Sequence, residues 1–196
     1  MAYPPLWPEL DAARLALGRA RLSRHPDVDP SSLDRECRDV LHALLFALLA
    51  ERHRIIPHGK LAALFARERP VDAVVQHLHQ LSARLHTSLW PDAARGRWRF
   101  GASAHSELGE RLLRLDLSGV PVETMGRWHE AMSAAPLQVA EDGSLVCGPD
   151  RRRVRGVFYT PARVARRIVQ RTLGPLLAGK SPEELGEFAL LDPACG

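Results

Sequence analysis

Two short segments toward the C-terminal end of the chain carry residue types that build a ligand-binding loop. Residues 188–191 are all apolar, as in the central strand of a parallel sheet, and run directly into Asp-Pro-Ala-Cys-Gly at 192–196. Where such a strand stops, a glycine lets the backbone approach a bound cofactor. Upstream, residues 156–161 read Gly-Val-Phe-Tyr-Thr-Pro and open a helix. The two segments together predict a pocket for a nucleotide-type cofactor.

The order and separation of these segments give the chain a family resemblance. It resembles the S-adenosylmethionine-dependent N6-adenine DNA methyltransferases of restriction–modification systems, and most of all the type I and type IIG enzymes. In that family a Tyr-Thr-Pro segment precedes a strand-end loop that reads Asp-Pro-Ala-Cys-Gly-Ser-Gly or a close variant. Weaker similarities of pattern lie upstream, at 44–52 and 126–132.

The resemblance implies a role for each matching residue. The family would place Thr160 and the helix start that follows it toward the methionine carboxylate, since a helix N-terminus favours an anion. Asp192 would lie near the methionine ammonium group. The cofactor-binding residues implied in this way are Tyr159, Thr160, Pro161, Asp192, Pro193, Ala194, Cys195 and Gly196.

Other parts of the family pattern do not occur in these 196 residues. The second glycine of the loop is missing, as is the acidic residue that would hold the ribose hydroxyls. There is no Asn-Pro-Pro-Tyr, the motif that in this family grips the flipped adenine. We therefore assign no catalytic residue and expect this polypeptide by itself neither to methylate nor to cut DNA.

The resemblance implies an enzyme for the complete protein. It would transfer a methyl group from S-adenosyl-L-methionine to adenine in double-stranded DNA, in restriction–modification or phage defence, with a specificity or restriction subunit as a further partner. Two alternatives stay open. One is a non-catalytic helical module that binds DNA or a partner, and the other is a methyltransferase that acts on RNA or protein.

Composition indicates an ordinary globular chain. Hydrophobic residues make up 45% and charged residues 26%, which argues against disorder. The net charge is +4, a mild bias toward polyanions. A basic run at 151–155, Arg-Arg-Arg-Val-Arg, could contact DNA phosphates or form a solvated linker.

Neither the cysteines nor the apolar runs indicate a metal site or a membrane span. The three cysteines, Cys37, Cys147 and Cys195, share no metal-ligand spacing, and the histidines lack a partner set for zinc. The longest apolar run, 40–50, is too short to cross a bilayer, and the N-terminus does not resemble a signal peptide. We expect a reduced, cytoplasmic protein with no membrane partner.

The elements that would position these segments are mostly helices. Apolar residues recur at steps of three and four along the best-specified of them, which runs from about Leu33 to Leu49. Ser31 or Ser32 could cap its start. The predicted helices cover 9–24, 31–55, 59–65, 71–86, 103–116 and 121–134, with an aromatic loop at 90–101.

Beyond residue 136 the sequence no longer predicts helices alone. Apolar residues on either side of Asp142-Gly143 favour a small hairpin, although a solvated linker fits equally well. Thr160 would cap the next helix with Pro161 at its first position, and Ser181 would open a capping box.

The predicted fold is mainly α, in three parts. Residues 1–135 form an N-terminal helical domain, and 136–158 a linker or small hairpin with the basic run. Residues 159–196 form the truncated start of a Rossmann-like α/β methyltransferase domain, with one helical region and its first strand.

Overall fold

A computed structural model describes residues 7–67, 70–85, 102–117, 119–121, 124–151 and 160–191. The chain divides into two compact units, Met1–Val157 and Phe158–Gly196. The described part is mainly helical, as predicted, with one two-stranded antiparallel sheet. The aromatic loop predicted at 90–101 lies wholly outside the described residues.

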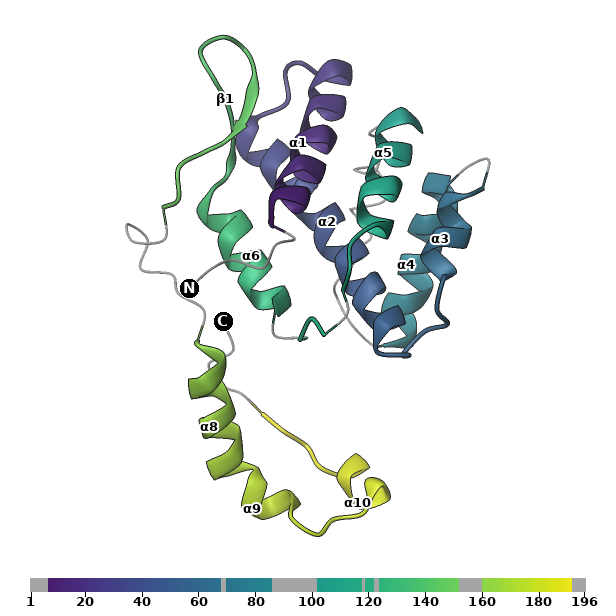
Figure 1. The fold of residues 1–196 in the computed structure, drawn as a ribbon, viewed down its shortest axis with the longest axis vertical. Helices are drawn as coiled ribbons and strands as arrows, with labels where there is room; N and C mark the ends of the chain where they lie inside the picture. The colour runs from purple at the N-terminus through teal and green to yellow at the C-terminus, as the bar shows by residue number, and fades with distance from the viewer. Residues whose placement is uncertain are drawn as a thin grey trace. The chain divides into compact units, whose positions relative to one another are not determined.

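The first unit is a set of helices with a hairpin (Figure 1). Helix α2 packs against α1, α3 and α6, while α5 packs against α1, α3 and α4. The hairpin contacts α2 through β1 and α1 through β2. The elements are α1 (Trp7–Arg24), α2 (Pro30–Arg52), α3 (Lys60–Phe65), α4 (Pro70–Arg84), α5 (Ala102–Leu113), α6 (Thr124–Ala134), β1 (Leu137–Val139) and β2 (Leu145–Cys147).

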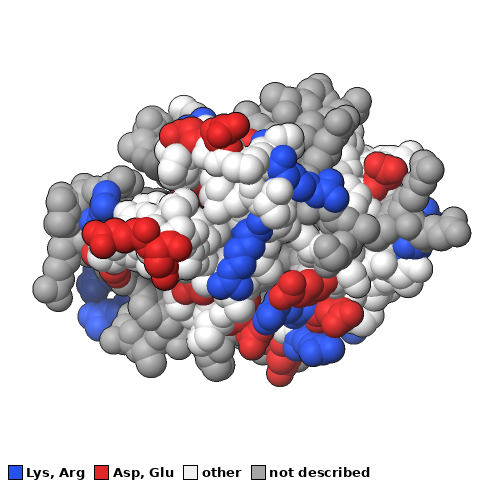
Figure 2. Space-filling view, turned by 90° about the horizontal axis from the view of Figure 1, so that it is seen from above, with Lys and Arg blue, Asp and Glu red and all other residues white. Residues whose placement is uncertain are grey.

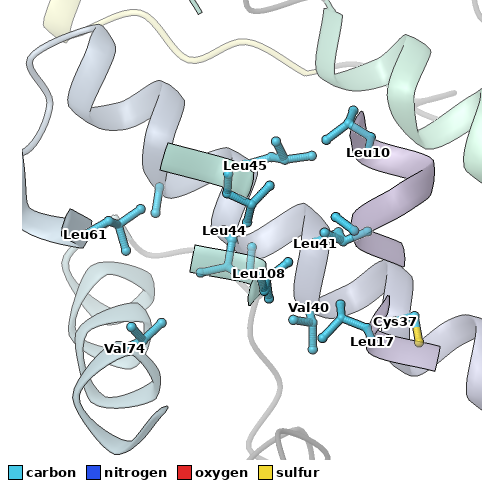
Figure 3. Close-up of a cluster of buried hydrophobic side chains, with 14 of the residues drawn as sticks. Leu10, Leu17, Cys37, Val40, Leu41, Leu44, Leu45, Leu61, Val74 and Leu108 are labelled. Atoms are coloured by element: carbon cyan, nitrogen blue, oxygen red, sulfur yellow. The ribbon is translucent and has the colours of Figure 1, made fainter. Parts of the chain in front are cut away.

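The apolar stripe of α2 forms the centre of the core, as its spacing predicts. Leu41, Leu44 and Leu45 are fully buried. The same buried cluster includes side chains from α1, α3, α4 and α5, among them Leu10, Leu61, Val74 and Leu108 (Figure 3). Truncating one such leucine to alanine typically costs about 2–5 kcal/mol, so this stripe carries much of the unit's stability.

The start of α2 differs from the prediction by one capping residue. Asp29, and not Ser31 or Ser32, occupies the N-cap, and its Oδ2 accepts from the backbone N–H of Ser32 at 2.9 Å. Pro30 then stands in the first turn, where it has no N–H to satisfy. The Ser31 hydroxyl donates to Asp29 as well, and this hydrogen bond is the main cause that lowers the pKa of Asp29.

The hairpin forms, so the linker alternative is wrong for residues 137–147. The strands pair antiparallel with Gln138 opposite Val146. Gly143 takes a φ of +79° in the connecting loop, a conformation that favours glycine. Leu137 and Leu145 on the inner face are 2% and 5% exposed, so the hairpin is part of the core of the first unit.

The second unit contains α8 (Ala162–Thr172), α9 (Gly174–Leu177) and α10 (Pro182–Gly186). The predicted capping box at Ser181 is confirmed, with Glu184 as its partner. The predicted cap at Thr160 is wrong, because α8 begins one residue later, with Pro161 at the N-cap and no side-chain cap bond.

The predicted strand over 188–191 is also wrong. These residues belong to no strand, and none occurs among residues 160–191. The physical reason is that a strand needs a neighbour to pair its N–H and C=O groups, and this unit offers none in its described part. The Rossmann-like assignment therefore remains a proposal.

Candidate functional site

The structure describes two of the eight residues that the sequence assigns to the cofactor pocket. Thr160 and Pro161 are both exposed and lie immediately before α8. Tyr159 and residues 192–196 (Asp192, Pro193, Ala194, Cys195 and Gly196) lie outside the described residues. Whether the two motif segments lie together therefore falls outside what the described residues test.

The start of α8 is chemically suited to an anion. No side chain caps this end of the helix. The N–H groups of Val164 and Ala165 donate to the Pro161 carbonyl, at 2.8 and 3.1 Å. Ala162 and Arg163 are the first two residues of the helix. Their N–H groups have no carbonyl acceptor within the helix, because no helical turn precedes them.

Helix α8 has two sharply different faces. On one face Val164, Ile168 and Val169 are each about half exposed, at 47%, 54% and 51%. The opposite face bears arginines, and the helix contains no Asp or Glu. A shallow surface hollow of about 520 Å³ lies on that face, lined by Arg163, Arg166, Arg167, Gln170 and Arg171.

The rest of the second unit leaves its apolar side chains in solvent. Leu190 and Leu191 are 62% and 88% exposed, and Leu176 is 57% exposed. None of the residues in α8, α9 or α10 is buried. Apolar side chains at these positions have the pattern of a core layer, but the described residues of this unit contain nothing that covers them.

A second polar cluster lies in the first unit, where the sequence assigned no site. Arg14 on α1 is fully buried, and its Nη2 donates to Asp34 Oδ1 and, at 2.7 Å, to the carbonyl of Ala135. Asp34 Oδ1 also accepts from the backbone N–H of Leu137 at 2.9 Å, and its Oδ2 lies 2.9 Å from Arg38 Nε. This cluster joins α1, α2, the end of α6 and the hairpin.

A groove of about 410 Å³ opens beside this cluster. It lies at the start of α2, between the end of α6 and the first strand. Three arginines and one carboxylate line it, and the other six lining residues are half polar and half apolar. The lining residues are Pro30, Ser31, Asp34, Arg35, Arg38, Ser133, Pro136, Leu137, Gln138 and Arg151.

Sequence reasoning missed this groove, although one signal was present. Asp34 and Arg38 stand one helical turn apart, and Asp34 sits next to Leu33 and three residues before Cys37 in the buried stripe. A charged residue inside an apolar stripe indicates a buried partner, because an unpaired charge there is costly. The partner on α1 and the groove itself depend on tertiary packing.

Glu51 is a buried carboxylate with a structural role. It is 6% exposed, and its two oxygens accept from the backbone N–H groups of Gly59 and Leu61, at 2.9 and 2.6 Å. These N–H groups belong to the start of α3, which has no other side-chain cap. Glu51 therefore fastens α3 to the end of α2.

Two histidines meet where α2 and α6 pack. The rings of His42 and His129 have centroids 4.9 Å apart. Burial, and then the positive charges of His129, Arg38 and Arg14, lowers the pKa of His42 to about 4. Burial also lowers the pKa of His129. Burial thus disfavours the protonated form of both rings.

Metal and thiol chemistry find little support in the described residues. Among them there is no group of three or more His, Cys, Asp or Glu side chains placed to hold a metal ion. Cys37 is buried, and burial raises the pKa of its thiol to about 12. It therefore packs as a small apolar side chain.

Comparisons with known proteins add nothing to these observations. No protein family, no curated protein and no solved structure matches the chain.

In the part of the chain that the structure describes, every helix is too short or too polar to cross a membrane. Charged side chains of both signs are interspersed on the face seen in Figure 2.

Proposed function

We propose that the chain is the N-terminal part of an S-adenosylmethionine-dependent N6-adenine DNA methyltransferase. The first unit is its helical domain, and the second unit is the beginning of the domain that binds the cofactor. The complete enzyme methylates adenine in duplex DNA as part of restriction–modification or phage defence, in the cytoplasm, together with a specificity or restriction subunit.

One observation carries the proposal. A strongly amphipathic helix starts directly after Tyr-Thr-Pro, and its apolar face is exposed, as is the apolar segment that leads into Asp-Pro-Ala-Cys-Gly. In a Rossmann-like domain a helix of this kind covers a parallel sheet, and the apolar segment is a central strand of that sheet. The exposed side chains in the second unit have the pattern that such a sheet would bury.

The uncapped start of α8 also fits the proposed ligand. S-adenosylmethionine supplies an activated methyl group and carries a carboxylate on its methionine end. The free N–H groups of the first turn and the helix dipole would hold that carboxylate, while the Thr160 hydroxyl adds a donor. Asp192 would offset the methionine ammonium.

Titration calorimetry of the complete protein with S-adenosylmethionine tests the proposal. We expect binding, and a loss of at least tenfold in affinity for Asp192→Asn, because a charge-assisted hydrogen bond typically contributes about 1.5–3 kcal/mol. Glu187→Gln is the matched control. It makes the same chemical change five residues away, at an exposed position that ends α10, and should leave the affinity unchanged.

The reading frame beyond residue 196 provides an independent check. The proposal expects Ser-Gly next and an Asn-Pro-Pro-Tyr-like motif within the following domain. Absence of both, or binding of S-adenosylmethionine that neither Asp192→Asn nor Thr160→Val changes, overturns it.

A further inference from the structure

We infer that the groove at the start of α2 binds phosphate groups of a nucleic-acid backbone, with Arg35, Arg38 and Arg151 as its contacts. This groove, called here the arginine groove, is lined by the residues named above for the 410 Å³ cavity. It lies wholly within the first unit, so the inference does not rest on the proposed methyltransferase function.

The charge of the arginine groove favours an anion. Three arginines line it against one carboxylate, that of Asp34. This carboxylate is already engaged, because Arg14 holds it from the buried side and the backbone N–H of Leu137 donates to it. With Asp34 neutralised from within, the arginines facing the groove leave a positive surface.

Two of the three arginines have their side chains available. Arg35 and Arg151 are exposed, and neither makes an ion pair with any residue in the described part of the chain. The backbone N–H of Arg151 donates to the carbonyl of Ala134 at 2.9 Å, which fixes the position of this residue at the groove. Guanidinium groups that line one groove can each form paired hydrogen bonds with a phosphate.

The third arginine is held in place by the buried cluster. Arg38 Nε lies 2.9 Å from Asp34 Oδ2, and its Nη1 donates to the Ser133 hydroxyl at 2.7 Å. Ser133 accepts that bond and keeps its own hydroxyl hydrogen for another acceptor. Arg38 is thus held at the groove by two contacts, one to Asp34 and one to Ser133.

The sequence favours a polymer over a small phosphate ester. Arg151 is the first residue of the run Arg-Arg-Arg-Val-Arg at 151–155, so three more arginines follow it closely in the sequence. A stretch of several cations suits a backbone with regularly repeated phosphates, whereas one phosphate ester needs a closed pocket. Duplex DNA is the occupant to which we commit.

Fluorescence anisotropy with a labelled 20-base-pair duplex and the full 196-residue chain tests the inference. Replacing Arg35 and Arg151 together by glutamine should weaken binding about 10- to 100-fold at 0.1 M salt and reduce the salt slope by about 2, since two phosphate contacts are lost. Arg38 is left intact because it supports Asp34.

The matched control removes the same charge elsewhere. Arg111→Gln with Arg114→Gln removes one arginine of α5 and the arginine directly after this helix, which pair with Glu107 and Glu110. This control should bind DNA nearly as the unchanged chain does, and circular dichroism should show that both double variants fold. Equal weakening by the two double variants overturns the inference.

A parallel experiment with inorganic phosphate distinguishes a nucleic-acid backbone from a free phosphate ester as the ligand of the groove. If phosphate, at matched ionic strength, raises the melting temperature of the chain and the Arg35/Arg151 variant abolishes that rise while the duplex fails to bind, the groove takes free phosphate esters. That result overturns the assignment to a nucleic-acid backbone. Binding of single-stranded RNA in preference to duplex DNA overturns the choice of partner.

Discussion

The buried Arg14–Asp34 pair makes the strongest prediction about this fold. Arg14 has no exposed surface, and its guanidinium makes its hydrogen bonds through Nη2 to Asp34 and the Ala135 carbonyl. Replacing Asp34 by asparagine keeps the shape of the side chain but removes the carboxylate that is hydrogen-bonded to Arg14, which among the described residues leaves only Asp11, whose Oδ1 lies 4.0 Å from Nη1. A buried charge that has lost its partner typically costs about 3–5 kcal/mol.

The expected loss is large against the whole stability of such a unit. Domains of this size unfold with about 5–15 kcal/mol, so a loss of about 3–5 kcal/mol in Asp34→Asn removes at least about a fifth of the total stability. At about 2–4 °C per kcal/mol, the melting temperature should fall by roughly 6–20 °C. Urea unfolding followed by far-ultraviolet circular dichroism measures the change in free energy.

Two further variants isolate the cause. Glu36→Gln removes the partner of Arg21 in a partly exposed ion pair between α2 and α1, and should cost about 1 kcal/mol or less. Adding Arg14→Met to Asp34→Asn removes the stranded charge and should restore part of the loss. The reasoning is refuted if Asp34→Asn costs no more than Glu36→Gln, or if Arg14→Met makes the Asp34→Asn variant still less stable.

Three other perturbations have defined outcomes. Glu51→Gln should destabilise the unit by about 1–3 kcal/mol and speed amide exchange in α3, because its carboxylate caps that helix. Burial lowers the pKa of His42 from 6.5 to about 4, so the unfolded chain binds the proton more readily. Stability should therefore fall by up to about 1.4 kcal/mol per pH unit as pH drops from 6.5 toward 4, and His42→Gln should flatten that slope in urea titrations. Gly18→Ala should destabilise by about 1–3 kcal/mol despite the better helix propensity of alanine, since the new Cβ would overlap Leu145 and displace the hairpin.

Each of these outcomes has an opposite that would count against the structure. Unchanged exchange in α3 for Glu51→Gln would mean that the cap is not formed. A pH slope that persists in His42→Gln would assign the effect to other groups, and a more stable Gly18→Ala variant would place the hairpin away from α1.

Local signals were enough to predict most helices, because their apolar spacing coincides with real burial. The stripe of α2 and the capping box at Ser181 are both confirmed. The N-cap of α2 could also have been predicted from the sequence. Proline prefers the first helical position, so Pro30 points to Asp29 as the cap and not to the serines after it.

Such local signals could not predict contacts between residues that are far apart in the sequence. Asp34 meets Arg14 across 20 positions and the backbone of Leu137 across 103. A charged side chain looks the same in sequence whether solvent or a buried partner neutralises it. The arginine groove, which depends on these contacts, could not be found without the fold.

The predicted strand at 188–191 shows a different limit. Four apolar residues with no polar alternation fit a buried strand, but the backbone forms one only beside another strand. The described residues of the second unit supply no such neighbour, and Leu190 and Leu191 remain in solvent.

The most direct test of the proposed activity follows the methyl group itself. The product of the uninterrupted reading frame is incubated with trideuteromethyl S-adenosylmethionine and adenine-containing duplex DNA, and the nucleosides are then separated by mass. The proposal predicts trideuterated N6-methyladenine, which disappears with Asp192→Asn and persists with Glu187→Gln. A label found in RNA or protein and not in DNA, or no transfer to any acceptor, would contradict it.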